Sequence, residues 1–145
     1  MSRTLAREAA FKALFQLDFN AGEVDERETY EELAVENAIE DAKENGKGKL
    51  NRENLIYINE TVRSVMARRD DIDKVIRIFL REDWTLNRLA AADRNILRLA
   101  VYELKIAEKK VPKGVAINEA VELAKKYGTD DSARFVNGIL DAIAN

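Results

Sequence analysis

Cysteine and histidine are both absent from the 145 residues of this sequence. The absence of cysteine excludes disulfides, thiolate metal sites and cysteine nucleophiles. The absence of histidine excludes the usual zinc sites, serine–histidine–aspartate triads and imidazole acid–base chemistry. Carboxylate pairs such as Glu103 with Glu119 are the remaining route to catalysis, but these residues sit among ordinary helical charges. We therefore expect a protein that is not an enzyme and that holds no metal or cofactor.

Long apolar runs are also missing. The longest apolar runs, such as residues 76–80, are interrupted by Lys or Arg and are far shorter than the roughly 18 residues of a membrane-spanning helix. Residues 1–8 lack the apolar run and the small-residue cleavage site of a secretory signal. We expect a cytoplasmic protein with no membrane segment.

The formal net charge of -3 conceals a strongly acidic segment. Residues 23–44 hold ten acidic and two basic side chains, a balance of -8, which leaves +5 for the rest of the chain. Nucleic-acid affinity depends on the local field near the phosphates rather than on the overall charge. The low pI therefore does not exclude RNA binding.

Apolar residues recur with helical spacing almost throughout, and no stretch alternates as a strand would. The pattern predicts helices over residues 4–19, 25–45, 51–69, 70–80, 93–107 and 117–127, a single turn at Leu86 and Leu89, and a last helix from Thr129 or Asp130. Gly22 and Gly128 are expected to end helices, and residues 44–49 to form a mobile loop. The prediction is an all-α fold: one helical domain over residues 1–145, with about seven helices in two packed three-helix sub-bundles.

Arg3, Arg7, Phe11 and Phe15 are spaced by four residues and so lie along one row of the first helix. Guanidinium groups that lead into aromatic rings suit single-stranded RNA, where arginines meet phosphates and rings stack on bases. The alternative is that both phenylalanines belong to the core. A second basic cluster, within residues 63–81, is opposed by aspartates and is interpreted as a solvated helix face.

The segment that begins the last helix combines charge with an aromatic ring. Phe135 falls at the edge of the apolar stripe, beside Arg134. Near a helix N-terminus, backbone N–H groups, Ser132 and Arg134 could hold phosphate or ribose while Phe135 stacks on a base. Asp131 could accept hydrogen bonds from a base edge or could cap its own helix.

Residues 115–128, VAINEAVELAKKYG, followed by residues 135–141, FVNGILD, closely resemble the signature of the bacterial NusB transcription antitermination family. Residues 6–15 and 96–104 are similar to that family too, so the resemblance covers essentially the whole chain. It implies a non-catalytic helical adaptor that pairs with the ribosomal protein NusE, binds the boxA element of nascent ribosomal RNA transcripts and joins the RNA polymerase antitermination complex.

The resemblance also implies a set of site residues. Asp93 falls where the family directs an acidic residue toward NusE, although it could equally be a plain N-cap. Only two arginines precede Phe11, which implies weak RNA affinity for the protein without NusE. The residues implied to bind RNA are Arg3, Arg7, Phe15, Asp131, Ser132, Arg134 and Phe135.

Two other functions are compatible with the sequence. One is a helical scaffold that binds only proteins, and the other is a stand-alone RNA-binding module that assists an enzyme that modifies ribosomal RNA. The scaffold differs from the adaptor in salt dependence, because RNA binding through phosphates weakens steeply as salt rises.

Overall fold

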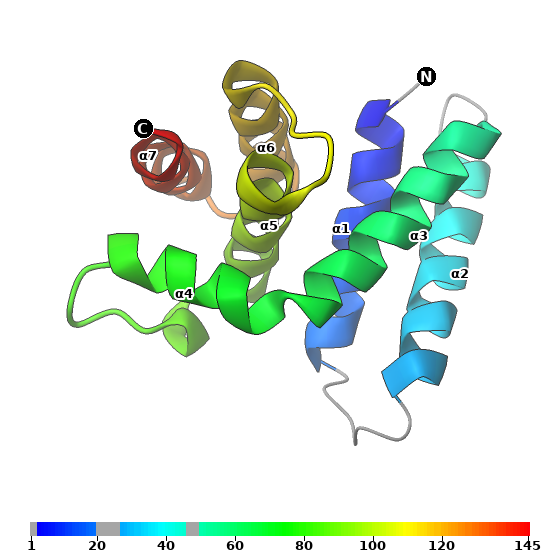
Figure 1. Cartoon of the computed structure of the whole chain (residues 1–145), viewed down its shortest axis with the longest axis horizontal. Coiled ribbons are helices and arrows are strands. Elements are labelled where there is room, and N and C mark those ends of the chain that lie inside the picture. Colours follow the sequence, from blue (N-terminus) through cyan, green and yellow to red (C-terminus); the bar gives the residue numbers. More distant parts are fainter. Residues whose placement is uncertain (1–2, 20–26, 46–49) are drawn as a thin grey trace. The chain divides into compact units, whose positions relative to one another are not determined.

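The computed structural model describes residues 3–19, 27–45 and 50–145, and the regular elements in these ranges are all helices (Figure 1). The all-α prediction is confirmed. The predicted roles of Gly22 and of most of the 44–49 loop lie outside the described residues. The elements are α1 (Arg3–Phe19), α2 (Arg27–Asn45), α3 (Arg52–Ala67), α4 (Arg69–Phe79), the 3₁₀ turn η2 (Leu86–Arg88), α5 (Ala91–Val101), the π-helical segment η3 (Tyr102–Ile106), α6 (Lys113–Tyr127) and α7 (Ser132–Ala144).

The chain divides into two compact units, which we call unit 1 (residues 1–67) and unit 2 (residues 68–145). In unit 1, α1 packs against both α2 and α3. The buried face of α1 is rich in alanine, which permits close approach of neighbouring helices, and Phe11 fills the remaining space. Lys12 of α1 forms an ion pair with Asp41 of α2. The buried residues of α2 are Ala34, Val35, Ala38 and Ala42, which lie along one face of that helix.

Unit 2 is built around α5, which packs against α4, α6 and α7. All seven residues from Asn95 to Val101 are buried, so α5 has the apolar surroundings of a central helix. Unit 2 thus holds four α-helices, where the sequence suggested a sub-bundle of three, because α4 contributes its buried Ile72 and Ile76 to this core. Within the described ranges, no helix is long and apolar enough to cross a membrane.

Three helix starts in unit 2 differ from the predicted ones. The helix predicted over residues 117–127 begins earlier, at Lys113, with Pro112 at its N-cap position. The N-cap of α5 is Ala90, whose carbonyl accepts the N–H of Arg94 at 3.0 Å. The interpretation of Asp93 as an N-cap is therefore wrong: η2 buries Leu86 and Leu89, and the helix begins directly after them, which puts Asp93 inside the first turn. The last helix begins at Ser132, after a turn that contains Thr129 and Asp130.

The helix that was predicted to continue to residue 107 is α-helical only as far as Val101. The following residues form the wider π turn, and Ala107 N–H donates to the Tyr102 carbonyl at 2.8 Å. Val111 N–H then donates to the carbonyl of the buried Glu103 at 3.0 Å and folds the chain back before α6. Such single π turns occur frequently at functional sites, although here the turn serves to reverse the chain.

Candidate functional site

The first candidate residues lie at the start of α1 in unit 1, where two arginines meet one tyrosine of α3. The guanidinium carbon of Arg3 is 4.4 Å from the Tyr57 ring centroid, and that of Arg7 is 5.9 Å from it. Arg3 Nε also donates a hydrogen bond to Asn54 Oδ1 at 3.0 Å. Arg3 is exposed, whereas Arg7 is only 6% exposed. Of the two predicted RNA contacts, Arg3 is thus the more accessible.

The aromatic residues further along α1 differ in exposure. Phe11 is buried and belongs to the core, as one of the two interpretations held, while Phe15 is half-buried. The ring centroids of Phe15 and Phe19 are 5.0 Å apart in an edge-to-face arrangement. Phe19 is 67% exposed, so the row ends in an accessible ring. Its spacing of four from Phe15 was the signal that could have added Phe19 to the predicted set.

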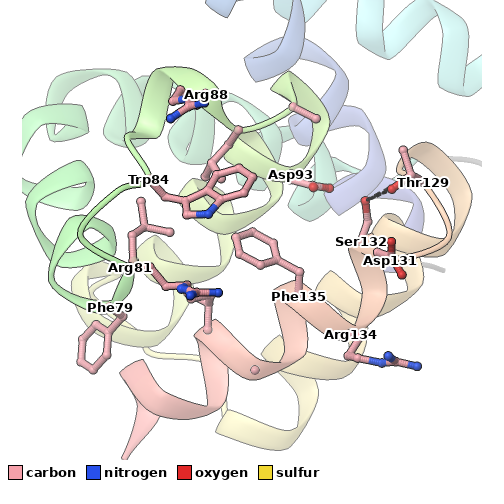
Figure 2. Close-up of a pocket in the computed structure, with 15 residues that line it drawn as sticks. Phe79, Arg81, Trp84, Arg88, Asp93, Thr129, Asp131, Ser132, Arg134 and Phe135 are labelled. Carbon is pink, nitrogen blue, oxygen red and sulfur yellow. Dashed lines mark hydrogen bonds between the residues drawn. The ribbon is translucent and has the colours of Figure 1, made fainter.

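In unit 2 the predicted residues gather around a pocket of about 630 Å³. Figure 2 shows its wall, to which the end of α4, the segment through η2, the start of α5 and the start of α7 all contribute. The predicted residues on this wall are Asp93, Asp131, Ser132, Arg134 and Phe135. The structure therefore brings together side chains that lie about forty positions apart in the chain.

Aromatic rings form part of this wall. Trp84 and Phe135 lie close to each other in Figure 2, with Arg81 beside them. Trp84 is 47% exposed, and the Arg88 guanidinium carbon is 5.9 Å from the indole ring centroid. Trp84, Arg81 and Arg88 were not predicted as pocket residues, because they lie between or at the ends of the elements that the helical pattern predicts, the helix over residues 70–80 and the turn at Leu86 and Leu89. Their signal was a tryptophan flanked by arginines in an irregular segment.

Asp93 supplies the least satisfied polar atom of the pocket. Its Oδ1 is buried and has no hydrogen-bond partner in the part of the chain that the structure describes. Buried carboxylate oxygens without a partner are rare, because they lose their hydrogen bonds to water and gain none from the protein. Figure 2 places the carboxylate on the pocket wall near Ser132, where a bound group with an N–H or O–H could donate to it.

The turn before α7 arranges the remaining residues. Ser132 is buried, and its Oγ accepts the N–H of Thr129 at 2.9 Å. Asp131 occupies the N-cap position, but its side chain makes no capping hydrogen bond, so the capping alternative is wrong. Asp131 and Arg134 are exposed beside the half-buried Phe135. An anionic hydrogen-bond acceptor, a cation and an aromatic ring thus share one short stretch of surface.

Gly128 explains why this turn is so tight. A Cβ atom at this position would lie 2.4 Å from Ser132 Oγ and 2.8 Å from the Ala124 carbonyl oxygen. The glycine is required by close approach, since its φ is -97° and any residue could adopt it. Its presence lets the end of α6 lie directly against the start of α7, which brings Asp131 and Phe135 to the pocket.

Across the described ranges the protein is all-helical, with a basic and aromatic helix in one unit and, in the other, an aromatic pocket that holds a carboxylate with one unpaired oxygen. Comparison with known proteins gives the family. The NusB family model matches residues 4–145. The chain is 42% identical over its full length, and over 96% of the relative, to a transcription antitermination protein NusB of Natranaerobius thermophilus. A NusB protein of Clostridium novyi is 40% identical over 97% of this chain and 96% of its own length. This chain belongs to the NusB family.

Solved structures of NusB proteins are similar to this chain over nearly its whole length. The structure of T. maritima NusB matches with a TM-score of 0.82 at 40% identity, over 99% of this chain and 91% of that one. A chain in the crystal structure of antitermination factors NusB and NusE in complex with double-stranded RNA matches with a TM-score of 0.79 at 30% identity, over 98% of this chain and 95% of that one. Both likenesses extend over both units.

Proposed function

We propose that this protein is a transcription antitermination factor that binds the boxA element of nascent ribosomal RNA transcripts together with the ribosomal protein NusE. In this role it is a non-catalytic adaptor between the RNA and the RNA polymerase antitermination complex, and it works in the cytoplasm. The observation that carries the proposal is the match, over nearly the whole chain, to a chain in the crystal structure of antitermination factors NusB and NusE in complex with double-stranded RNA.

The RNA-binding residues we propose are Arg3, Arg7, Phe15, Asp131, Ser132, Arg134 and Phe135. The chemistry of unit 2 supports this set, because Phe135 offers a ring for base stacking and Arg134 an exposed guanidinium for phosphate. Asp131 is exposed beside them and would accept hydrogen bonds from a base edge. Ser132 would contribute mainly by holding the turn, since its oxygen already accepts a backbone hydrogen bond.

Asp93 is proposed to face NusE. A protein partner can bring an N–H donor, and a hydrogen bond from it would satisfy the unpaired Asp93 oxygen. The same pocket is lined by Arg81, Arg88 and Trp84. Arginine and aromatic residues of this kind are enriched at the centres of protein interfaces. The pocket is therefore suited to a side chain of the partner.

Terminator read-through tests the proposal as a whole. Purified bacterial RNA polymerase would transcribe a template that carries boxA upstream of a terminator, with NusE and the other antitermination factors present, and with or without this protein. We expect read-through to rise only when the protein is added and boxA is intact. Read-through that is unchanged, or that rises equally on a template with scrambled boxA, would contradict the adaptor function.

A further inference from the structure

The ring of Tyr57 is shared by two arginines that are held very differently. Its centroid is 4.4 Å from the guanidinium carbon of Arg3 and 5.9 Å from that of Arg7. Arg3 is exposed and Arg7 is 6% exposed. A guanidinium that is buried against the protein offers fewer N–H groups to a ligand than one at the surface. A direct phosphate contact is therefore open chiefly to Arg3.

The Arg3 guanidinium is also held by a hydrogen bond to a residue of α3. Its Nε donates to Asn54 Oδ1 at 3.0 Å, and Asn54 is only 5% exposed. Asn54 is itself anchored, because its backbone N–H donates to Asn51 Oδ1 at 2.8 Å at the start of α3. The acceptor for Arg3 thus belongs to a rigid helix start. The bond leaves the N–H groups of both terminal nitrogens of Arg3, the pair that forks onto phosphate oxygens.

We propose that Asn54 and Tyr57 are positioning residues that hold the Arg3 guanidinium ready for one phosphate of the bound RNA. Arg7 adds positive potential from its buried position. The proposal rests on the RNA-binding function proposed above and deepens it, because it assigns roles to two residues of α3. Arginine side chains normally lose much rotamer freedom on binding, and a guanidinium already held by a ring and an amide loses less.

The arrangement also bears on the low arginine content of this N-terminus. Only two arginines precede Phe11, so the electrostatic attraction that many cations would supply is limited. Fixing one guanidinium in a binding geometry partly offsets that shortage, because less freedom is lost for each contact made.

The test is a set of titrations of fluorescent boxA RNA in the presence of NusE, with the wild-type chain and with Arg3→Ala, Tyr57→Leu, Tyr57→Phe and Arg3→Ala/Tyr57→Leu. Lys43→Ala is the matched control, because Lys43 is an exposed cation of the same unit whose charge faces Glu40 at 4.0 Å. Each titration is repeated at several salt concentrations, and thermal unfolding verifies that each variant is folded.

We expect Arg3→Ala to weaken boxA binding about tenfold, as loss of a charge-assisted contact does, and to lower the slope of log affinity against log salt by about 0.7, as loss of one phosphate contact on a single strand does. Tyr57→Leu should weaken binding about two- to fivefold, the range of a lost cation–π contact. Tyr57→Phe, which keeps the ring, and Lys43→Ala should bind within twofold of wild type.

The double variant decides whether Tyr57 acts through Arg3. If it does, Tyr57→Leu adds nothing once Arg3 is alanine, which a merely structural role would not produce. The proposal is overturned if Tyr57→Leu binds as wild type does, or if its effect persists in the Arg3→Ala background. If the wild-type chain itself fails to distinguish boxA from a scrambled RNA, the proposed RNA-binding function is contradicted. If the wild-type chain does distinguish them and only the variants depart from expectation, the positioning role of Tyr57 alone is contradicted.

Discussion

Asp73 of α4 and Arg98 of α5 form a two-pronged ion pair in the interior of unit 2. Arg98 Nε donates to Asp73 Oδ1 at 2.9 Å, and the second terminal nitrogen donates to Oδ2 at 3.1 Å. Each side chain is 7% exposed. Asn95 Oδ1 accepts a further hydrogen bond from Arg98 at 3.3 Å. The pair ties α4 to the central helix and so fixes one wall of the pocket.

Removal of one partner from this pair should therefore destabilise unit 2. Arg98→Met leaves the Asp73 carboxylate buried without its cation, and we expect it to lower the free energy of unfolding by about 3–5 kcal/mol. Asp71→Asn, which breaks the exposed pair with Arg68, should change it by less than about 1 kcal/mol. Urea unfolding followed by circular dichroism measures both. Equal effects of the two substitutions would show that the buried pair has no special structural role.

Gly128→Ala should destabilise the turn before α7. Its Cβ would meet Ser132 Oγ and the Ala124 carbonyl, and overpacking of this kind lowers stability by about 1–3 kcal/mol. Gly114→Ala is the control, since a Cβ there meets nothing within 4 Å and alanine is favoured in a helix. Thermal unfolding should show a fall for the first variant and no loss for the second. An unchanged midpoint for Gly128→Ala would contradict the close approach.

Asp93→Ala should have opposite effects on stability and on partner binding. It removes a buried oxygen without a partner, so the isolated protein should be as stable as wild type or more stable. NusE binding should fall about tenfold or more, as loss of a buried charged hydrogen bond at an interface does. Calorimetric titration with NusE and thermal unfolding provide the two readouts. A variant that loses stability yet binds NusE normally would place Asp93 in the fold rather than in the interface.

Phe135→Ala should weaken RNA binding with little effect on folding. The ring is half-buried at the pocket, and removal of a stacked aromatic residue weakens binding by about 1–3 kcal/mol per base. Phe11→Ala, at a ring of the unit 1 core, should instead lower stability by about 3–5 kcal/mol. Unchanged affinity for boxA in Phe135→Ala would remove this residue from the RNA-binding set.

Helical periodicity accounts for most of what the sequence could predict of the fold. The run of Ile72, Val75, Ile76, Phe79 and Leu80 identifies α4 because its apolar side faces the core, and the observed helix covers all of these residues except Leu80. The start of α5 was missed because Asp93 is a good N-cap type, while the actual start is determined by burial of Leu86 and Leu89 in the preceding turn. That burial is a tertiary effect, which local spacing does not carry.

The candidate site could be predicted in part, for a similar reason. Asp93, Asp131 and Phe135 come from the family resemblance and from residue chemistry, and the structure places all three on one pocket. Trp84 and Tyr57 were missed because their contacts come from residues elsewhere in the fold: Trp84 lies in an irregular segment, and Tyr57 meets an arginine 54 positions earlier. Only the folded chain brings such partners together.

The most direct test of the proposed RNA-binding function is the affinity for fluorescent boxA RNA, measured with and without purified NusE against a scrambled RNA of equal length and at two salt concentrations. An antitermination adaptor should bind boxA selectively, and this binding should strengthen when NusE is present and weaken as salt rises. Equal binding to both RNAs, or none to either, with NusE present would contradict that function and would favour a helical scaffold that binds only proteins.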